Sequence, residues 1–260
     1  MLTAFLIGFA VLIVTFAIVW MIGCRVKNYG FVDATWSYGI TLVAPVYAIL
    51  GTGYLPRRLI LTTIGVVWSL RLGTHILVRL LRHHPEEDHR YQSLRQEWKS
   101  PVQFLVFFEM QALTVAVLSL PFLLAAFDPR PYFTIVEILG YAVAVLALLG
   151  EALADHQIKI FASNPANKGK VCQTGLWRYS RHPNYFFEAL VWWGFFLAAL
   201  SSPWGWVTII CPLMMLWFLL KVTGIPLTEK HSVERKGQAY RDYQKTTSAF
   251  IPWFPKKNAS

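Results

Sequence analysis

Six ionisable side chains interrupt the long apolar stretches of this 260-residue chain. They are Arg71, His75, Glu109, Glu137, Glu151 and Glu188. Charged groups inside apolar segments are costly, and they usually face a cavity or one another and serve a function. Carboxylates, histidine and arginine can bind, polarise or protonate a substrate. We therefore expect the apolar part of the chain to hold a functional site.

Arg71, His75 and Trp68 have the spacing of residues on one helix face, because His75 follows Arg71 by four positions and Trp68 precedes it by three. Arg71 lies about ten residues, or roughly 15 Å at helical rise, from the end of its apolar stretch. Glu109 is nearly as deep and has Gln111 as a neutral companion. Two interpretations remain open: an ion pair between Arg71 and Glu109 that joins helices, or a polar cavity. His75 is either part of that cavity or a satisfied interior histidine.

A second candidate site is the basic segment 167–185, which precedes the apolar stretch that carries Glu188. It combines four cations with aromatic rings, a glycine and Asn184 at the expected start of a helix. Arginine and lysine bind phosphates, and a helix N-terminus presents free N–H groups. The segment therefore predicts an anionic ligand that carries a ring. A basic loop resting on lipid headgroups is the alternative that composition allows.

Several common site motifs are missing from the sequence. It has no Walker loop and no complete Gly-x-Gly-x-x-Gly motif, so a bound nucleotide would not be held by a Rossmann fold. Its three cysteines and seven histidines lack the spacing of a zinc site, so we predict no metal.

Membrane helices must position these residues. Hydrophobic residues make up 55% of the chain and charged residues 15%, against roughly 25% charged in soluble domains. The apolar stretches have about the 20 residues that cross a hydrocarbon core of roughly 30 Å. We predict an all-α, polytopic integral membrane bundle of about seven transmembrane helices. The expected spans are residues 2–23, 36–51, 59–81, 102–127, 131–154, 185–201 and 203–221.

The distribution of positive charge predicts the orientation. If the N-terminus is outside and the spans alternate, Arg57, Arg58 and Arg130 lie outside and Arg71 lies within a span. The other 20 of the 24 Lys and Arg residues then fall on the inner side, as the positive-inside rule requires. We therefore predict a multi-pass protein of the inner membrane with a cytoplasmic C-terminus. The net charge of +10 suits anionic membrane lipids and gives no argument for a nucleic-acid partner.

With this orientation, all the buried ionisable groups except Glu137 lie in the inner half of the membrane. That arrangement predicts a cavity open to the cytoplasm, and it favours an enzyme over a carrier. The inner segments 83–99, 155–184 and 222–260 are also long, and long loops often carry function. Within them, residues 90–98 are predicted to form a short interfacial helix, and residues 229–244 a second helix.

The chain resembles the steroid 5-alpha-reductase family in four segments. The most specific runs from Thr174-Gly175-Leu176-Trp177 through Arg181-His182-Pro183-Asn184-Tyr185 to Glu188. The other three, which resemble bacterial members, are NYGFVDATW at 28–36, WSLRLGTH at 68–75 and GQAYRDY at 237–243. The similarity extends from about Asn28 to Pro255, nearly the whole chain.

The resemblance implies a seven-helix enzyme that uses NADPH to reduce a carbon–carbon double bond conjugated to a ketone. The expected reaction is reduction of the 4,5 double bond of a 3-keto-4-ene steroid or a similar lipidic enone. Residues 1–127 would mainly serve the substrate and 128–260 the cofactor, within one domain over 1–260. Carried over by position, Asn184 and Glu188 would meet the nicotinamide and ribose, while the arginines and aromatic residues would surround the phosphates and adenosine. The implied cofactor-binding residues are Asp155, Lys168, Trp177, Arg178, Arg181, His182, Asn184, Tyr185, Glu188, Arg235, Lys236, Tyr240 and Tyr243.

On the substrate side, the family's Gln-Glu pair falls at Val32-Asp33, and a family tyrosine falls at Trp68. We expect Asp33 and His75 to polarise the ketone, with Arg71 holding the acid or the substrate. A protonated Asp33 in an apolar pocket would donate a hydrogen bond to the ketone oxygen, where negative charge develops. The expected substrate-binding residues are Trp36, Trp68, Glu109 and Gln111.

Two other functions compete with the reductase. Membrane methyltransferases of the isoprenylcysteine or phospholipid type use S-adenosylmethionine and share an Arg-His-Pro-x-Tyr signature. Their tail normally carries an adjacent acidic pair, which this tail lacks around Glu229 and Glu234. A non-enzymatic sterol or lipid carrier is the third possibility. For the reductase, the expected partners are the lipidic enone and membrane lipids, and we expect a monomer.

Overall fold

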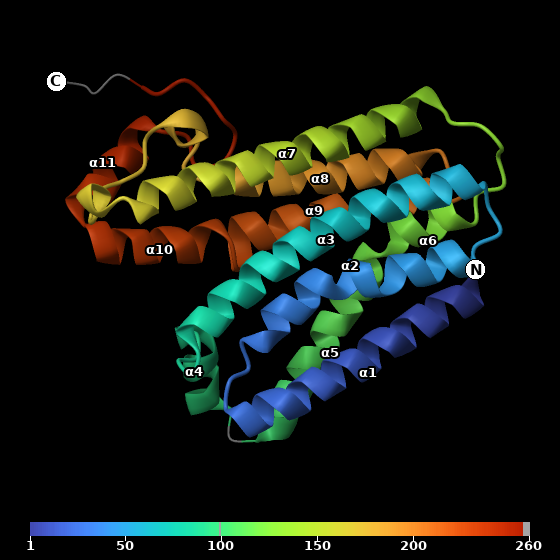
Figure 1. Cartoon of the computed structure of the whole chain (residues 1–260), viewed down its shortest axis with the longest axis horizontal. Coiled ribbons are helices and arrows are strands. Elements are labelled where there is room, and N and C mark those ends of the chain that lie inside the picture. Colours follow the sequence, from blue (N-terminus) through green and yellow to red (C-terminus); the bar gives the residue numbers. More distant parts are fainter. Residues whose placement is uncertain (99, 257–260) are drawn as a thin grey trace. The chain divides into compact units, whose positions relative to one another are not determined.

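The computed structural model describes residues 1–98 and 100–256, and their regular structure is helical (Figure 1). Lys99 and the last residues, 257–260, lie outside the described residues, so the ends of the predicted inner segments 83–99 and 222–260 are not covered. Short 3-10 turns at Pro165–Asn167, Gly175–Arg178 and Gly205–Ile209 and a π turn at Phe218–Val222 join the helices. The α-helices are α1 (Leu2–Val26), α2 (Phe31–Leu50), α3 (Leu55–His83), α4 (His89–Glu97), α5 (Pro101–Leu118), α6 (Leu120–Ala126), α7 (Ile135–Ser163), α8 (Pro183–Leu200), α9 (Ile210–Trp217), α10 (Ile225–Lys236) and α11 (Gln238–Thr246).

Five helical segments in the described residues are long and apolar enough to cross a membrane, which makes the chain a multi-pass membrane protein. The predicted spans 36–51 and 185–201 form helices α2 and α8, which are not among the five. The all-helical fold is therefore confirmed, whereas seven spans and their orientation stay predictions. The five segments are Leu2–Val26, Leu55–His83, Pro101–Leu118, Ile135–Ser163 and Gly205–Lys236.

Two predicted helices are interrupted in the structure. The span predicted over 102–127 breaks at Ser119, between α5 and α6, and Pro121 lies in the first turn of α6. Proline lacks the N–H that a continuous helix would need at that position. The helix predicted over 229–244 breaks at Gly237, which has a φ of 54° that glycine adopts easily. The helix predicted over 90–98 is confirmed as α4, and Asp88 caps its N-terminus.

The chain divides into two compact units. Unit 1 contains Met1–Ile138 and Ala198–Thr208, and unit 2 contains Leu139–Leu197 and Ile209–Ser260. In unit 1, α2 packs against α1, α3, α5 and α6. The α3–α6 contact is so close that a Cβ at Gly65 would lie 2.3 Å from the Phe122 ring. In unit 2, α7 and α8 approach equally closely, since a Cβ at Gly150 would lie 2.5 Å from the ring of Phe187. Figure 1 shows α7 and α8 running side by side.

Candidate functional site

The clearest polar cluster of unit 1 surrounds Asp33, in the first turn of α2. Its carboxylate accepts hydrogen bonds from Arg90 Nη2 at 2.7 Å and from the Tyr91 hydroxyl at 2.6 Å. Arg90 also donates from Nε and Nη2 to the Asp88 carboxylate, at 3.0 Å in each case. Helix α4 is thereby tied to the start of α2. Tyr91 is buried, whereas the side chains of Arg90 and Asp33 keep 27% and 29% of their surface exposed.

The surroundings of Tyr91 keep its hydroxyl neutral. Burial, followed by the negative charge of Asp33, raises the pKa of Tyr91 well above its ordinary value. The hydroxyl is therefore a hydrogen-bond donor at physiological pH. Arg90 stays cationic because Asp33 and Asp88 outweigh the effect of burial and raise its pKa. A neutral donor, a cation and a carboxylate are thus held within one cluster.

This cluster bears on two expectations about Asp33. We expected Arg71 to hold the acid or the substrate, and the structure shows that Arg90 and Tyr91 of α4 bind the acid. We also expected Asp33 to lie in an apolar pocket and to donate a hydrogen bond. Its side chain is instead partly exposed and accepts hydrogen bonds from a guanidinium and a hydroxyl. The pairing joins residues 57 positions apart, and no local spacing indicates it.

The other predicted substrate-side residues lie on α2, α3 and α5 of unit 1. Trp68 is almost fully buried, Arg71 is half-buried and His75 is exposed. The Trp36 indole donates to Thr114 Oγ1 at 2.8 Å, and that hydroxyl donates to the Gln111 carbonyl at 2.8 Å. Trp36 is therefore brought to the turn of α5 that carries Gln111.

Glu109 has one oxygen that is buried with no hydrogen-bond partner among the described residues. A buried polar atom left unpaired costs roughly 1–3 kcal/mol. Glu109 Oε2 is thus an acceptor, or a donor when protonated, that no residue in 1–98 and 100–256 uses. This state suits a residue that meets a ligand.

Arg181 is the centre of a polar network in unit 2. Its Nε donates to Glu229 Oε1 at 2.6 Å, and its Nη1 donates to the carbonyls of Gln244 at 3.0 Å and Thr247 at 2.6 Å. Its backbone N–H donates to the Ser248 carbonyl at 2.8 Å. One arginine in the loop before α8 thereby joins that loop to α10, α11 and the segment after α11.

Sequence reasoning missed Glu229 as a site residue. Its Oε1 atom accepts from Arg181 and lies 3.3 Å from His182 Nε2, while Oε2 accepts from Gln244 Nε2 at 2.9 Å. Glu229 therefore links the Arg-His pair of the signature to both C-terminal helices. The available signal was an acid in a tail that is mainly basic, and this signal does not identify its partners.

Predicted aromatic residues complete the same network. The Tyr243 hydroxyl donates to the carbonyls of Trp177 and Ser180, and the Trp177 indole donates to the Ala154 carbonyl on α7 at 2.9 Å. Tyr185 stacks on His182 with ring centroids 5.4 Å apart, and its hydroxyl is 3.0 Å from Thr228 Oγ1. These contacts hold the loop before α8 against α7, α10 and α11.

The two C-terminal tyrosines are neutral. Burial, followed by the charge of Glu229, raises the pKa of Tyr240 to about 12. Burial also raises the pKa of Tyr243. Both side chains therefore keep their hydroxyl protons, and Tyr243 uses its proton in the contacts to Trp177 and Ser180.

Asn184 and Glu188 lie four residues apart near the start of α8, on one helix face. Asn184 Nδ2 donates to Asp155 Oδ1 at 3.3 Å. Its Oδ1 atom is buried and has no hydrogen-bond partner among the described residues. Glu188 is buried and accepts from the Trp192 indole at 3.1 Å. The amide oxygen of Asn184 is thus free to accept a hydrogen bond from a ligand.

The remaining predicted cofactor-binding residues are basic. Lys168, Arg178 and Arg235 are exposed, and within the described residues they make no side-chain hydrogen bond or ion pair. Lys236 is half-buried beside Arg235. These cations are available to an anionic ligand. No group of three or more His, Cys, Asp or Glu side chains in residues 1–98 and 100–256 could hold a metal ion.

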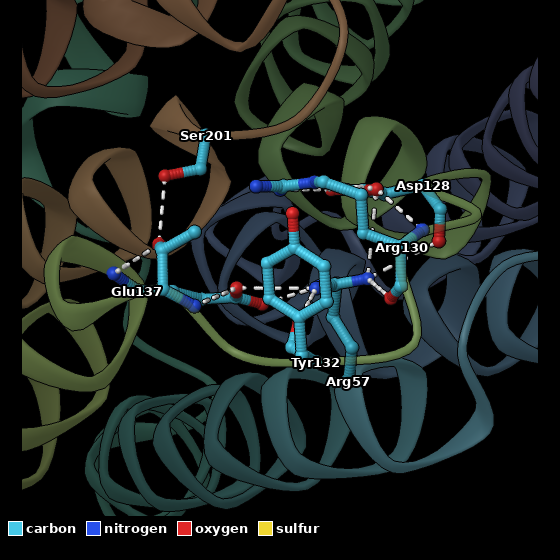
Figure 2. Close-up of polar contacts among 7 residues, drawn as sticks. Arg57, Asp128, Arg130, Tyr132, Glu137 and Ser201 are labelled. Atoms are coloured by element: carbon cyan, nitrogen blue, oxygen red, sulfur yellow. Dashed lines mark hydrogen bonds and ion pairs between the residues drawn. The ribbon is translucent and has the colours of Figure 1, made fainter.

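A separate charged cluster in unit 1 surrounds Arg57 (Figure 2). Its guanidinium pairs with both oxygens of Glu137 and donates to the carbonyls of Asp128, Arg130 and Tyr132. The side chains of Arg57 and Glu137 are fully buried. Arg57 was predicted only as an outer loop residue, and the structure instead places it in the first turn of α3. Because protein atoms satisfy its donors, the cluster has the character of a structural tie.

Comparison with known proteins now identifies the family. The family described as "Protein of unknown function (DUF1295)" matches residues 19–247. The chain belongs to the DUF1295 family. The DUF1295 family includes membrane proteins that resemble steroid 5-alpha-reductases. The match covers the Asp33 cluster, the Arg57 cluster and the Arg181 network except for Ser248, and it ends before residues 250–256.

A curated relative was found in fission yeast. The chain is 28% identical over 278 residues to the uncharacterized protein C594.04c of Schizosaccharomyces pombe (strain 972 / ATCC 24843). The alignment covers 95% of this chain and 79% of the relative. No solved structure matches the chain significantly.

Proposed function

We propose that the chain is an NADPH-dependent membrane reductase that reduces the 4,5 double bond of a 3-keto-4-ene steroid or a similar lipidic enone. One observation carries the proposal. The signature run from Arg181 to Tyr185 is joined through Glu229 to α10, through the Gln244 carbonyl to α11, and through the Thr247 carbonyl to the residue after α11. Segments that the family resemblance assigns to the cofactor therefore form one network in unit 2.

The residues of unit 2 fit a dinucleotide. The buried Oδ1 of Asn184 has no hydrogen-bond partner in residues 1–98 and 100–256 and can accept from a carboxamide or a ribose hydroxyl. Exposed Arg178, Arg235 and Lys168 supply the cations that phosphates require. When bound, NADPH would supply the hydride for the reduction.

We assign different tasks to Arg178 and Arg181. The Nε and Nη1 donors of Arg181 bind Glu229 and two carbonyls, so Arg181 positions the loop instead of contacting phosphate. Phosphate binding then falls to Arg178 and Arg235, whose side chains are exposed. Arg178→Ala is expected to weaken NADPH binding directly. Arg241→Ala removes an exposed arginine of α11 and is the matched control that should leave binding unchanged.

In unit 1, we assign ketone polarisation to the Asp33 cluster. Reduction of an enone places negative charge on the ketone oxygen, which needs a hydrogen-bond donor. The cluster offers the partly exposed Arg90 guanidinium, which Asp33 and Asp88 orient through its Nε and Nη2 atoms. The single proton of the Tyr91 hydroxyl is donated to Asp33, so Tyr91 positions that carboxylate. His75 on α3 is the alternative donor. The proton that completes the reduced carbon would come from water.

The finer membrane arrangement belongs to the same proposal. We propose seven spans in the inner membrane, with α2 and α8 added to the five segments that are long and apolar enough. The N-terminus would lie outside and the C-terminus in the cytoplasm. Labelling of cysteines introduced at Lys168 and Tyr132 in intact cells tests this orientation. Access to residue 168 from the periplasm would contradict it.

A titration with two cofactors tests the reaction class. The detergent-solubilised full-length chain is titrated calorimetrically with NADPH and then, separately, with S-adenosylmethionine. The reductase predicts binding of NADPH alone. Binding of S-adenosylmethionine alone would replace the reductase with the membrane methyltransferase, and binding of neither would favour a lipid carrier. Asn184→Ala is expected to weaken NADPH about tenfold, as loss of one ligand hydrogen bond does, whereas Asn164→Ala is a matched control.

A further inference from the structure

The C-terminal segment 250–256 combines a fixed backbone with exposed apolar side chains. Ile251, Trp253 and Phe254 keep 61%, 71% and 75% of their surface exposed. Water is a poor environment for a cluster of this kind, and exposed apolar patches often mark binding surfaces. The family match ends at residue 247 and does not account for this segment.

Three hydrogen bonds and a ring contact hold the segment in place. The Phe250 carbonyl accepts from Ser180 Oγ at 2.8 Å, the Trp253 N–H donates to the Tyr179 carbonyl at 2.9 Å, and the Lys256 N–H donates to the Thr246 carbonyl at 2.8 Å. The Phe250 ring also packs edge-on against Phe186 of α8, with centroids 5.8 Å apart. The exposed side chains therefore cannot turn inward without breaking these contacts.

The depth of the segment follows from the loop that holds it. Two residues before Tyr179, the Trp177 indole donates to the Ala154 carbonyl of α7, and Leu176 N–H donates to Gln157 on the next turn. From Ile135 to Ala154, α7 is apolar except for the buried Glu137 and Glu151, and this stretch is about as long as the 30 Å of a hydrocarbon core. A more polar stretch with Asp155, Gln157 and Lys159 follows. The loop, and the tail bound to it, thus lie beside the turn where the apolar part of a membrane helix ends.

The residue types also suit that depth. Tryptophan and other aromatic residues gather at the boundary between hydrocarbon and headgroups. Lys256 follows the exposed aromatic pair, and Lys159 lies on α7 two residues beyond Gln157; both are exposed. Lysine side chains near this boundary extend toward headgroups, and their charge complements anionic lipids.

We propose that residues 251–254 insert into the interface of the lipid bilayer, with Lys256 meeting anionic headgroups. The bilayer would then hold the loop at Tyr179 and Ser180, to which the tail is bound. This inference does not rest on the proposed reduction, because lipid contact can be measured without substrate or cofactor.

Tryptophan quenching in vesicles tests the proposal. The full chain and Trp253→Phe are reconstituted in phosphatidylcholine vesicles with and without phosphatidylglycerol. The difference between the emission of the wild-type chain and that of Trp253→Phe gives the emission of Trp253. Quenching of this emission by aqueous acrylamide is compared with its quenching by lipids that carry a doxyl group at carbon 5. We expect the Trp253 emission to be quenched by the labelled lipid and shielded from acrylamide. Trp192→Phe removes a fully buried tryptophan, and its lost emission should be shielded from acrylamide in any medium.

Three results would overturn the proposal. Quenching of the Trp253 emission by acrylamide alone would place the tail in water. Shielding from both quenchers would mean that protein, such as a second copy of the chain, covers it. Phosphatidylglycerol is expected to increase the shielding of Trp253 from acrylamide in the wild-type chain and not in Lys256→Gln. An equal increase in both would remove Lys256 from the headgroup contact.

Discussion

Two arginine–carboxylate pairs in unit 1 share one chemistry but differ in their surroundings. Arg57 and Glu137 are both fully buried, and carbonyls occupy the remaining donors of Arg57 (Figure 2). Arg90 and Asp33 keep more than a quarter of their side-chain surface exposed, and a neutral tyrosine joins them. The first pair can be reached only by unfolding the region around it, whereas the second can be reached by a ligand.

We propose that the difference separates structural charge from functional charge. A buried pair with satisfied donors holds elements together, and removing one partner leaves an uncompensated charge. A partly exposed pair contributes less to stability because water screens it. Glu109 adds to this contrast, since one of its oxygens is buried with no partner among the residues that the structure describes.

The largest expected effect is on stability, from Glu137→Gln. This change removes the nearer of the two buried carboxylates that pair with Arg57 and leaves only Asp128, whose Oδ1 lies 3.6 Å from Nη1. We therefore expect the free energy of unfolding to fall by about 3 kcal/mol, the lower end for a broken buried pair. Thermal unfolding in detergent measures it. Replacing both partners, by Arg57→Met with Glu137→Leu, should restore much of the loss. A loss below about 1 kcal/mol in Glu137→Gln would contradict the structural assignment.

Asp33→Asn and Tyr91→Phe should act mainly on turnover. Loss of a donor to developing negative charge typically lowers kcat about 10²- to 10³-fold. We expect Asp33→Asn, which releases Arg90, to approach that loss, and Tyr91→Phe, which removes one contact to Asp33, to lower kcat less. NADPH binding by unit 2 should be unchanged in both variants. Steady-state rates with an enone substrate give kcat, and calorimetry gives cofactor affinity. Tyr38→Phe removes a hydroxyl that bonds Thr74 and serves as control. Full turnover in both site variants would exclude the Asp33 cluster from the chemistry.

Glu109→Gln makes the same chemical change as Glu137→Gln and should have a different result. No described protein donor is lost at Oε2, so we expect stability to stay within about 1 kcal/mol of wild type. Substrate binding should weaken, and we expect KM to rise about tenfold for one lost hydrogen bond. If Glu109→Gln unfolded the protein as Glu137→Gln does, Glu109 would belong with the structural charges.

The smallest expected effect concerns Asp88, which caps α4. Asp88→Ala should cost about 1 kcal/mol at neutral pH, the usual value of an N-cap. Burial acts to raise the pKa of Asp88, but the hydrogen bond and charge of Arg90 outweigh burial and lower this pKa below its ordinary 3.8. A carboxyl whose pKa is lowered in the folded protein stabilises the fold at pH values above its ordinary pKa. This stabilisation is lost as the pH falls through the lowered pKa of the folded protein. The difference between wild type and Asp88→Ala should therefore shrink below about pH 4, as thermal unfolding across pH would record.

The helices were easier to predict from the sequence than the contacts between their side chains. The spacing of Tyr91, Leu94 and Trp98 predicted α4, because side chains at such intervals share one face. The break at Ser119, two residues before Pro121, and the break at Gly237 were not predicted. In each case a long run of similar residues indicated one continuous helix, and a single proline or glycine was given too little weight. Local pattern thus identifies helices better than it locates their ends.

The contacts of the candidate sites could not be predicted locally. Arg181 was assigned to a ligand from its residue type, and only the fold brings Glu229, 48 positions away, to its guanidinium. Arg57 and Glu137 were both noticed in the sequence, yet nothing in their spacing of 80 positions indicates a pair. Residue type predicts what a side chain can bind, and the packing of distant helices decides what it does bind.

Product analysis tests the central claim most directly. The purified full-length chain is incubated in detergent with NADPH and a 3-keto-4-ene steroid, and the steroid is analysed by mass spectrometry and chromatography. We predict a product two hydrogens heavier, reduced at the 4,5 double bond, with one NADPH oxidised for each molecule formed. An unchanged steroid together with NADPH that neither binds nor oxidises would contradict the reductase.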